Sequence, residues 1–231
     1  PAAPAPAAQA EAQSAAGVEA PQNAEALRAR LRELSQTAKR ASIYIGREFS
    51  AATDSARLRM PLGGDLIDPG VGEAEALNAA RPLIACSAPK ALYDVKALGA
   101  LLSEGEGDAF DTMLAAYVLD PQRPSFDPRA LCESAGVPWD AACPAASLWP
   151  LRLWQEEKLA ADELTAVYRD IERPLADVLY AMEREGFLID ADVLEALGRD
   201  FRARAAELEA QIYALAGEEF NIKSPKQLSE V

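Results

Sequence analysis

The sequence contains no histidine. Metal sites that use imidazole, and catalysis by Ser-His-Asp or Cys-His groups, are therefore excluded within this chain. Its three cysteines, Cys86, Cys132 and Cys143, are odd in number and show no CxxC spacing. They support neither a disulfide framework nor a zinc site, which fits a reducing cytoplasm. Any chemistry here has to use carboxylates, tyrosine, lysine or cysteine.

Long apolar runs and an excess of basic residues are also missing. No run approaches the length of a membrane span, and the N-terminus lacks the basic-then-apolar layout of a signal peptide. We therefore expect a soluble, intracellular monomer without membrane contact. The formal net charge of −14 argues against a general polyanion-binding surface. Any contact with nucleic acid must then be local, or most of the binding surface lies outside this chain.

The composition divides the chain into three parts. Residues 1–23 are rich in alanine and proline with almost nothing large to bury, which is typical of a disordered linker. Residues 24–160 mix strand and helix patterns, and residues 161–231 are strongly helical. The chain starts without methionine and stops at Val231, barely one turn into a helix. This indicates a piece of a larger protein.

Local patterns predict a sheet with helices packed on its faces, because strand and helix candidates alternate. A helix capped by Asn23 and a long helix from Asp190 to Gly217 are the clearest. The expected strands are 42–45, 83–86 and a hairpin of 57–62 with 65–68, and the other expected helices are 73–80, 90–102, 110–119 and 128–134.

Three stretches together resemble the bacterial DNA polymerase I family, the family A polymerases. They read AFDTMLAAYVLDP, IERPLADVLYAMEREGFLID and LEAQIYALAGEEFNIKSPKQL. The resemblance covers about residues 24–231 and implies an α/β fold. A ribonuclease H-like (DnaQ-like) 3′-5′ exonuclease-type domain would span 24–160, followed by a connecting helix and the start of the polymerase thumb in 161–231. The linker would be the tether that precedes them.

In this family the exonuclease holds two metal ions with four carboxylates. Two of these form an Asp-x-Glu motif at the end of the first strand, one Asp follows on a helix, and one belongs to a Tyr-x-x-x-Asp motif. Two neighbouring dications need several anionic oxygens to offset their repulsion. Here the first motif reads Gly46-Arg47-Glu48, so glycine replaces the bridging aspartate, while Asp94 in LYDVKALGALL matches the helix aspartate.

The sequence has no Tyr-x-x-x-Asp motif. Counting back from Trp154, which resembles a tryptophan of the family's terminal helix, the aligned positions fall near Pro138 and Ala142. Two carboxylates of four remain, Glu48 and Asp94, and we interpret them as remnants. The resemblance therefore predicts an inactive, structural exonuclease-like domain without bound metal.

Two alternatives stay open. The first is an active exonuclease that uses Glu48, Asp94, Asp111 and Asp140 in an altered site. Asp111 resembles a family residue outside the metal set. A role as the N-cap of a helix that starts before Leu114 explains the presence of this aspartate better. The second alternative is a protein-interaction module without a DNA role.

The best candidates for DNA contact follow the long helix. Lys223, Ser224 and Lys226 combine a helix start with two lysines, and amide N–H groups at a helix start favour anions. Gln227 is the expected capping-box partner of Ser224. Resemblance to the thumb implies contact with primer-template duplex DNA.

Arg199 and Arg202 lie one turn apart on the long helix and could meet phosphates. Pairing with acids such as Glu195 and Glu207 is an equal alternative.

The family's nucleotidyl-transfer carboxylates lie beyond Val231. We therefore expect this fragment to polymerise nothing and to need no cofactor, whereas the parent polymerase would need Mg²⁺. The resemblance implies a bacterial cytoplasmic protein, associated with the nucleoid, that acts in DNA replication and repair.

Overall fold

The computed structural model describes residues 17–63, 71–99 and 108–230. The chain forms two compact units, residues 1–184 and residues 185–231. None of the described helices combines the length and the hydropathy that crossing a membrane requires.

The first unit contains a five-stranded mixed sheet with the strand order β3-β2-β1-β4-β5. Neighbours are antiparallel in the β1–β2 and β2–β3 pairs and parallel in the β1–β4 and β4–β5 pairs. The strands are β1 (Ala41–Ile45), β2 (Glu48–Thr53), β3 (Arg57–Pro61), β4 (Lys90–Leu92) and β5 (Ala109–Asp111). The helices are α1 (Ala24–Thr37), α2 (Glu73–Ala85), α3 (Val95–Leu98), α4 (Thr112–Leu119), α5 (Pro128–Ala135), α6 (Pro144–Ala161) and a π-helix (Val167–Glu172) that continues into α7 (Arg173–Glu185).

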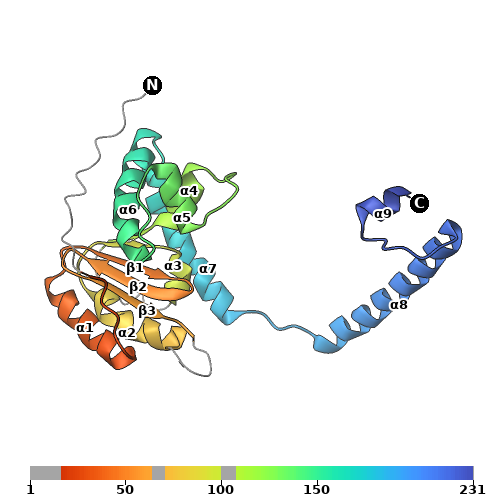
Figure 1. Ribbon diagram of the computed structural model, residues 1–231, viewed down its shortest axis with the longest axis horizontal. Helices are drawn as coiled ribbons and strands as arrows, with labels where there is room; N and C mark the ends of the chain where they lie inside the picture. Colours follow the sequence, from red (N-terminus) through yellow and green to blue (C-terminus); the bar gives the residue numbers. More distant parts are fainter. Residues whose placement is uncertain (1–16, 64–70, 100–107, 231) are drawn as a thin grey trace. The chain divides into compact units, whose positions relative to one another are not determined.

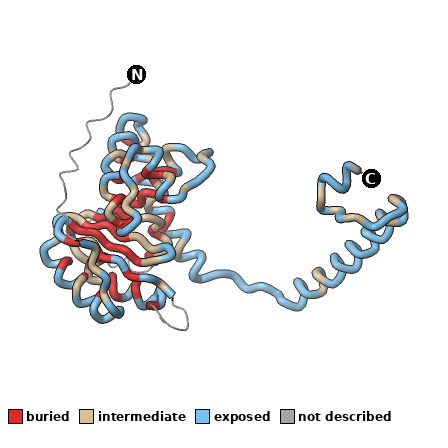
Figure 2. Tube along the Cα trace, in the orientation of Figure 1, coloured by how far each residue is buried: buried red, intermediate tan, exposed pale blue. Residues whose placement is uncertain are grey.

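Helices cover both faces of this sheet (Figure 1), as the alternation of strand and helix patterns predicted. Helices α1 and α2 lie against one face, where Ile43 of β1 and Ala51 of β2 are buried in one cluster with Leu27 of α1. On the other face, Ala52 of β2 packs with Ala145 of α6. Strand side chains alternate between faces, so each strand supplies both layers. Figure 2 shows the buried residues concentrated along the strands.

Two local predictions were wrong. Residues 83–86, expected as a strand, belong to the end of α2 and its cap. The helix expected from Lys90 begins instead with strand β4, and a three-residue strand is too short to show a period of its own. Strand β3 pairs with β2. Residues 65–68, the expected hairpin partner of 57–62, lie outside the described residues.

The end of the predicted linker has defined contacts with the sheet. The backbone N–H of Glu19 donates to the carbonyl of Arg57 at 2.8 Å, and its carbonyl accepts from Arg59 N–H at 2.9 Å. Its carboxylate accepts two hydrogen bonds from the Arg30 guanidinium, each 2.8 Å. Asn23 caps α1 as predicted, since its side chain accepts from Ala26 N–H at 2.8 Å. Residues 1–16 of the predicted linker lie outside the described residues.

The second unit is helical, with α8 (Ala191–Ala216) and α9 (Pro225–Glu230). The predicted ends of α8 are confirmed: Asp190 accepts a hydrogen bond from Val193 N–H at 3.1 Å, and Gly217 adopts a left-handed φ of 81°. No residue of α8 is buried, and its apolar stripe includes Phe201, which is 68% exposed.

Candidate functional site

The carboxyl ends of three parallel strands meet at one edge of the sheet. Strand β1 is followed by Gly46, strand β4 by Tyr93 and Asp94, and strand β5 ends at Asp111. Glu48 opens β2 and joins this edge, because β1 and β2 are paired through Ile45 and Phe49 next to the turn. The edge therefore brings together the two predicted remnants and the aligned glycine.

Glu48 is held by a neighbouring strand. Its Oε2 atom accepts a hydrogen bond from the Nε atom of Arg59 in β3, at 2.5 Å. The Glu48 side chain is 15% exposed and that of Arg59 is 46% exposed. The negative charge of Glu48 is therefore compensated within the protein.

An aromatic cluster occupies the space next to Gly46. A Cβ atom at Gly46 would lie 2.3 Å from the hydroxyl oxygen of Tyr44, closer than any real contact. The Tyr44 ring lies 5.8 Å from the ring of Tyr93 and 6.4 Å from that of Trp139, centroid to centroid. Burial raises the pKa of Tyr44, and nearby Asp127 and Glu48 add to the effect. A side chain at position 46 would have to displace this ring.

Tyr93 anchors the cluster. Its hydroxyl donates a hydrogen bond to the carbonyl of Phe126 at 2.8 Å. Burial raises the pKa of Tyr93 to about 12, with a further contribution from the charge of Asp127. Tyr44 and Tyr93 are therefore both neutral phenols at physiological pH.

Asp94 has an unusual backbone conformation, with φ 57° and ψ 80° in the left-handed region. Its Oδ1 atom is buried and, in the part of the chain that the structure describes, has no hydrogen-bond partner. A left-handed non-glycine residue costs about 1 kcal/mol or more, and an unsatisfied buried oxygen adds about 1–3 kcal/mol. Fold stability does not explain this strain.

Asp111 is a structural cap, as predicted. It is 2% exposed. Its carboxylate accepts hydrogen bonds from the backbone N–H groups of Val95 and Met113 at 2.9 Å and of Asp94 and Leu114 at 3.2 Å. Burial raises the pKa of Asp111, although the amides of Val95, Leu114 and Met113 act in the opposite direction. All four bonds hold the starts of α3 and α4.

The remaining carboxylate of the altered-site alternative lies elsewhere. Asp140 forms an ion pair with Arg57 at 2.8 Å, and its other oxygen accepts from the N–H of Ala142 at 2.9 Å. The strand pairing aligns Arg57 with Ala52 and Ala52 with Ser42, near the start of β1. At about 3.3 Å per residue, Arg57 and its partner Asp140 therefore lie more than about 10 Å from the Gly46 end of β1.

Within residues 17–63, 71–99 and 108–230, no three His, Cys, Asp or Glu side chains are grouped so that they could hold a metal ion. Ala142 is exposed, and so is Pro138. Four residues of the site were not predicted from the sequence: Tyr44, Tyr93, Trp139 and Arg59. One signal was present: Tyr44 and position 46 are two residues apart, so they share a face of an extended strand.

The predicted DNA-contact residues of the second unit are all on its surface or half-buried. Arg199 is paired with Glu195 at 2.9 Å, one of the two alternatives that the sequence allowed. The guanidinium of Arg202 lies over Gly198, since a Cβ atom there would be 3.4 Å from its Nη1 atom.

The start of α9 differs in detail from the predicted capping box. Ser224 Oγ accepts from Gln227 N–H at 3.4 Å, but the Gln227 side chain accepts from Asn221 N–H at 2.7 Å instead of from Ser224. Lys223 and Lys226 are exposed, and no ion pair engages them among the described residues.

The fold and this edge define an α/β domain whose carboxylates lie at the ends of parallel strands. No family model matches the chain. The chain is 34% identical over 181 residues to the thermostable DNA polymerase I of Thermus aquaticus, covering 71% of this chain and 22% of the relative. It is 40% identical over 129 residues to DNA polymerase I of Caldicellulosiruptor bescii, covering 52% of this chain and 15% of the relative.

A third relative, DNA polymerase I of Deinococcus radiodurans, is 34% identical over 162 residues, which cover 70% of this chain and 16% of the relative. A solved structure described as the POL domain of Pol1 from M. smegmatis, in complex with DNA primer-template and dNTP, matches with a TM-score of 0.62. That match has 23% identity and covers 87% of this chain and 38% of the solved chain, so it shows the fold. The predicted resemblance is confirmed: the chain corresponds to a segment of DNA polymerase I, and it spans a quarter or less of these relatives.

Proposed function

We propose that this chain is the part of a bacterial DNA polymerase I in which a ribonuclease H-like, exonuclease-type domain acts as a structural platform without nuclease activity. The strand order supports this domain type, with two antiparallel pairs, β1–β2 and β2–β3, on one side of β1 and two parallel pairs, β1–β4 and β4–β5, on the other. Residues 24–160 would form the domain, and residues 161–231 the connecting helix and the start of the thumb.

The observation that carries the proposal is the Tyr44 hydroxyl in the space of a side chain at position 46. A pair of dications needs several uncompensated anionic oxygens. Glu48 is neutralised by Arg59, and Asp140 is bound to Arg57. The donor set at the edge therefore does not fit two metal ions.

Digestion of labelled single-stranded DNA by the full chain, in Mg²⁺ or Mn²⁺, tests the platform role. We expect no shortening of the labelled strand beyond the chelator control. Metal-dependent shortening that disappears in Asp94→Ala would contradict the proposal.

A second candidate, an active 3′-5′ proofreading exonuclease with an altered site, is favoured by the strained backbone and unpartnered oxygen of Asp94. Strain of this kind is concentrated at functional sites. The altered site would use Asp94 and Glu48, and the same digestion assay separates it from the platform.

We further propose that the thumb segment helps to hold duplex DNA through Lys223, Ser224, Lys226, Arg199 and Arg202. The solved relative is described as a complex with DNA primer-template. The parent polymerase would use Mg²⁺ for DNA synthesis at the bacterial nucleoid and would act as a monomer, whereas this segment would need no cofactor.

Fluorescence anisotropy with a labelled primer-template duplex tests this contact. Binding should weaken steeply with salt and should weaken further in Lys226→Glu, because phosphate contacts release counterions. Glu209→Gln, a charge change on α8, is the control for a general effect of net charge. An absence of binding at low salt would favour the protein-interaction alternative.

A further inference from the structure

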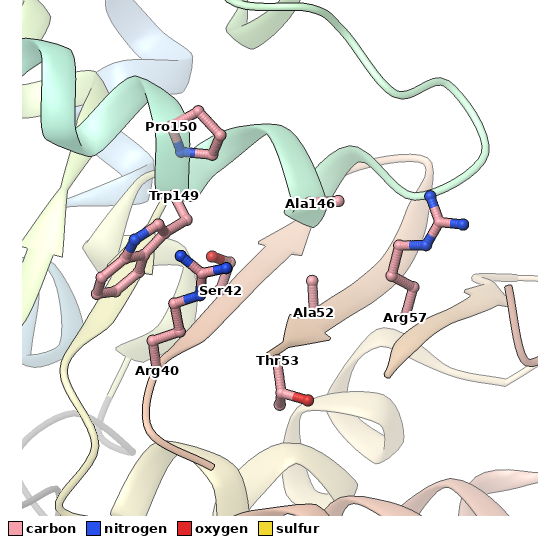
Figure 3. A pocket seen from close by; sticks show the side chains of 8 residues that line it. All are labelled: Arg40, Ser42, Ala52, Thr53, Arg57, Ala146, Trp149 and Pro150. Atoms are coloured by element: carbon pink, nitrogen blue, oxygen red, sulfur yellow. The ribbon is translucent and has the colours of Figure 1, made fainter. Parts of the chain in front are cut away.

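A small pocket lies at the opposite end of β1 from Gly46, between the sheet and α6 (Figure 3). Arg40 and Ser42 of the β1 start, Thr53 of the β2 end, and Trp149 of α6 contribute to its wall. Its cavity volume is about 40 Å³. The proposed platform role does not use this pocket, so the two ideas can fail independently.

Arg40 supplies the pocket with an uncommitted positive charge. Its guanidinium carbon lies 5.5 Å from the centre of the Trp149 ring. Among the described residues, this guanidinium has no ion pair or hydrogen bond. An arginine is attracted to the face of an aromatic ring, and the N–H donors of a guanidinium point outward from its edge. A guanidinium favours a flat or tetrahedral oxyanion.

Ser42 adds a hydroxyl to the wall of the pocket. Ser42 is 2% exposed, and its side chain is part of the pocket wall. Figure 3 shows Ser42 and Arg40 as lining residues of the same pocket. Thr53 Oγ1 accepts from the N–H groups of Ser55 and Ala56, each at 3.2 Å, and lies 3.3 Å from the Ser55 hydroxyl, so Thr53 is engaged with its own turn.

Arg40 is the group in the pocket wall that attracts an anion most strongly, because the neighbouring charged groups already have partners. Arg57 also lines the pocket but forms an ion pair with Asp140 at 2.8 Å. The carboxylate of Asp54, next to Thr53 in the chain, accepts from the backbone N–H of Lys39 at 2.9 Å. The charge of Asp54 is thus directed toward the backbone.

The volume selects a small ligand. One water needs roughly 10–15 Å³ by this measure, so the cavity holds about three water-sized groups. This suits a single tetrahedral oxyanion and excludes a whole nucleotide. We propose that the pocket binds a phosphate-type oxyanion, held by Arg40 and Ser42 against Trp149.

The source of the oxyanion is either free inorganic phosphate or a backbone phosphate of nucleic acid. Calorimetric titration of the full chain with inorganic phosphate, at constant ionic strength, tests the site. We expect saturable binding that weakens at least tenfold in Arg40→Gln, since a charge-assisted bond is lost. Lys39→Gln is the matched control, because it removes the same charge one residue away and outside the pocket wall.

Ser42→Ala keeps the Arg40–Trp149 contact and should weaken phosphate binding several-fold. This second variant tests the site even if Arg40→Gln has a folding defect. Circular dichroism of each variant checks the fold. Displacement of phosphate by a short single-stranded oligonucleotide would assign the site to backbone phosphate, and persistence of phosphate binding would assign it to the free ion. The proposal is overturned by a lack of saturable binding, or by equal binding in Arg40→Gln and Lys39→Gln.

Discussion

The hydroxyl oxygen of Tyr44 lies 2.3 Å from the point where a Cβ atom at Gly46 would stand. Residues 44 and 46 are thus coupled: the ring can hold its position because residue 46 has no side chain. The aspartate that the family resemblance places at position 46 and the ring at position 44 compete for one space.

Gly46→Ala should therefore lower the free energy of unfolding by about 1–3 kcal/mol, the usual range for overpacking. Urea denaturation measures this change. Tyr44→Ala should reduce the cost of the added methyl group in a double-mutant cycle. Gly17→Ala is the control, since nothing lies within 4 Å of its Cβ position. Equal effects at both glycines would refute the coupling.

Asp94→Gly should raise the free energy of unfolding by about 1 kcal/mol, because glycine tolerates the left-handed backbone and removes the unpartnered oxygen. Asp94→Ala removes the same oxygen but keeps the strain, so it should be less stable than Asp94→Gly. Urea denaturation of the pair isolates the backbone contribution. The interpretation of strain is wrong if alanine and glycine give the same stability.

Tyr168→Phe should cost about 1–3 kcal/mol, because it leaves a buried backbone N–H unsatisfied. The Tyr168 hydroxyl accepts from the N–H of Asp111 at 2.7 Å, and the residue is 6% exposed. Thermal unfolding measures the change. Tyr117→Phe is the control, as Tyr117 is 47% exposed. A similar loss in both variants would show that the hydrogen bond is not the cause.

Glu19 should make stability depend on pH in the acid range. Its hydrogen bond with Arg30 lowers the pKa of Glu19 below the usual 4.5, although burial acts in the opposite direction. A lowered pKa means that the contribution is present above about pH 4.5 and is lost as the pH falls through the folded-state value. Since the pair is partly exposed, we expect about 0.5 kcal/mol.

Urea denaturation of Glu19→Gln between pH 6 and pH 3 measures this contribution. The variant should be less stable at pH 6 and should approach the parent chain at pH 3. Glu157→Gln, an exposed change on α6, should follow the parent across the range. A constant gap between Glu19→Gln and the parent chain would rule out the ion pair as its origin.

The elements that the sequence predicted well carry their information locally. Asn23 and Asp190 cap long helices, and Gly217 ends one, so the local backbone chemistry is sufficient. Strands β4 and β5 have three residues each. The position of β4 depends on its pairing with β1, and that of β5 on its pairing with β4, in both cases with partners distant in the chain. Such pairing leaves no periodic pattern in a short run.

The loss of metal-ligand carboxylates from the candidate site could be predicted from the sequence. The side chains that fill or neutralise the site could not. The loss of the bridging aspartate follows from the glycine at position 46. The retained helix aspartate, Asp94, is identified by the motif around it. The ion pair of Glu48 with Arg59 arises from the pairing of β2 with β3, and Trp139 reaches Tyr44 from a loop far along the chain. These tertiary contacts have no local signature.

Titration of the full chain with Mn²⁺, followed by electron paramagnetic resonance of the free ion, tests the central claim most directly. If the edge cannot hold paired dications, Mn²⁺ should remain free up to millimolar concentrations, equally in the parent chain and in Asp94→Ala. Saturable uptake of two Mn²⁺ ions per chain that is abolished in Asp94→Ala would contradict the account.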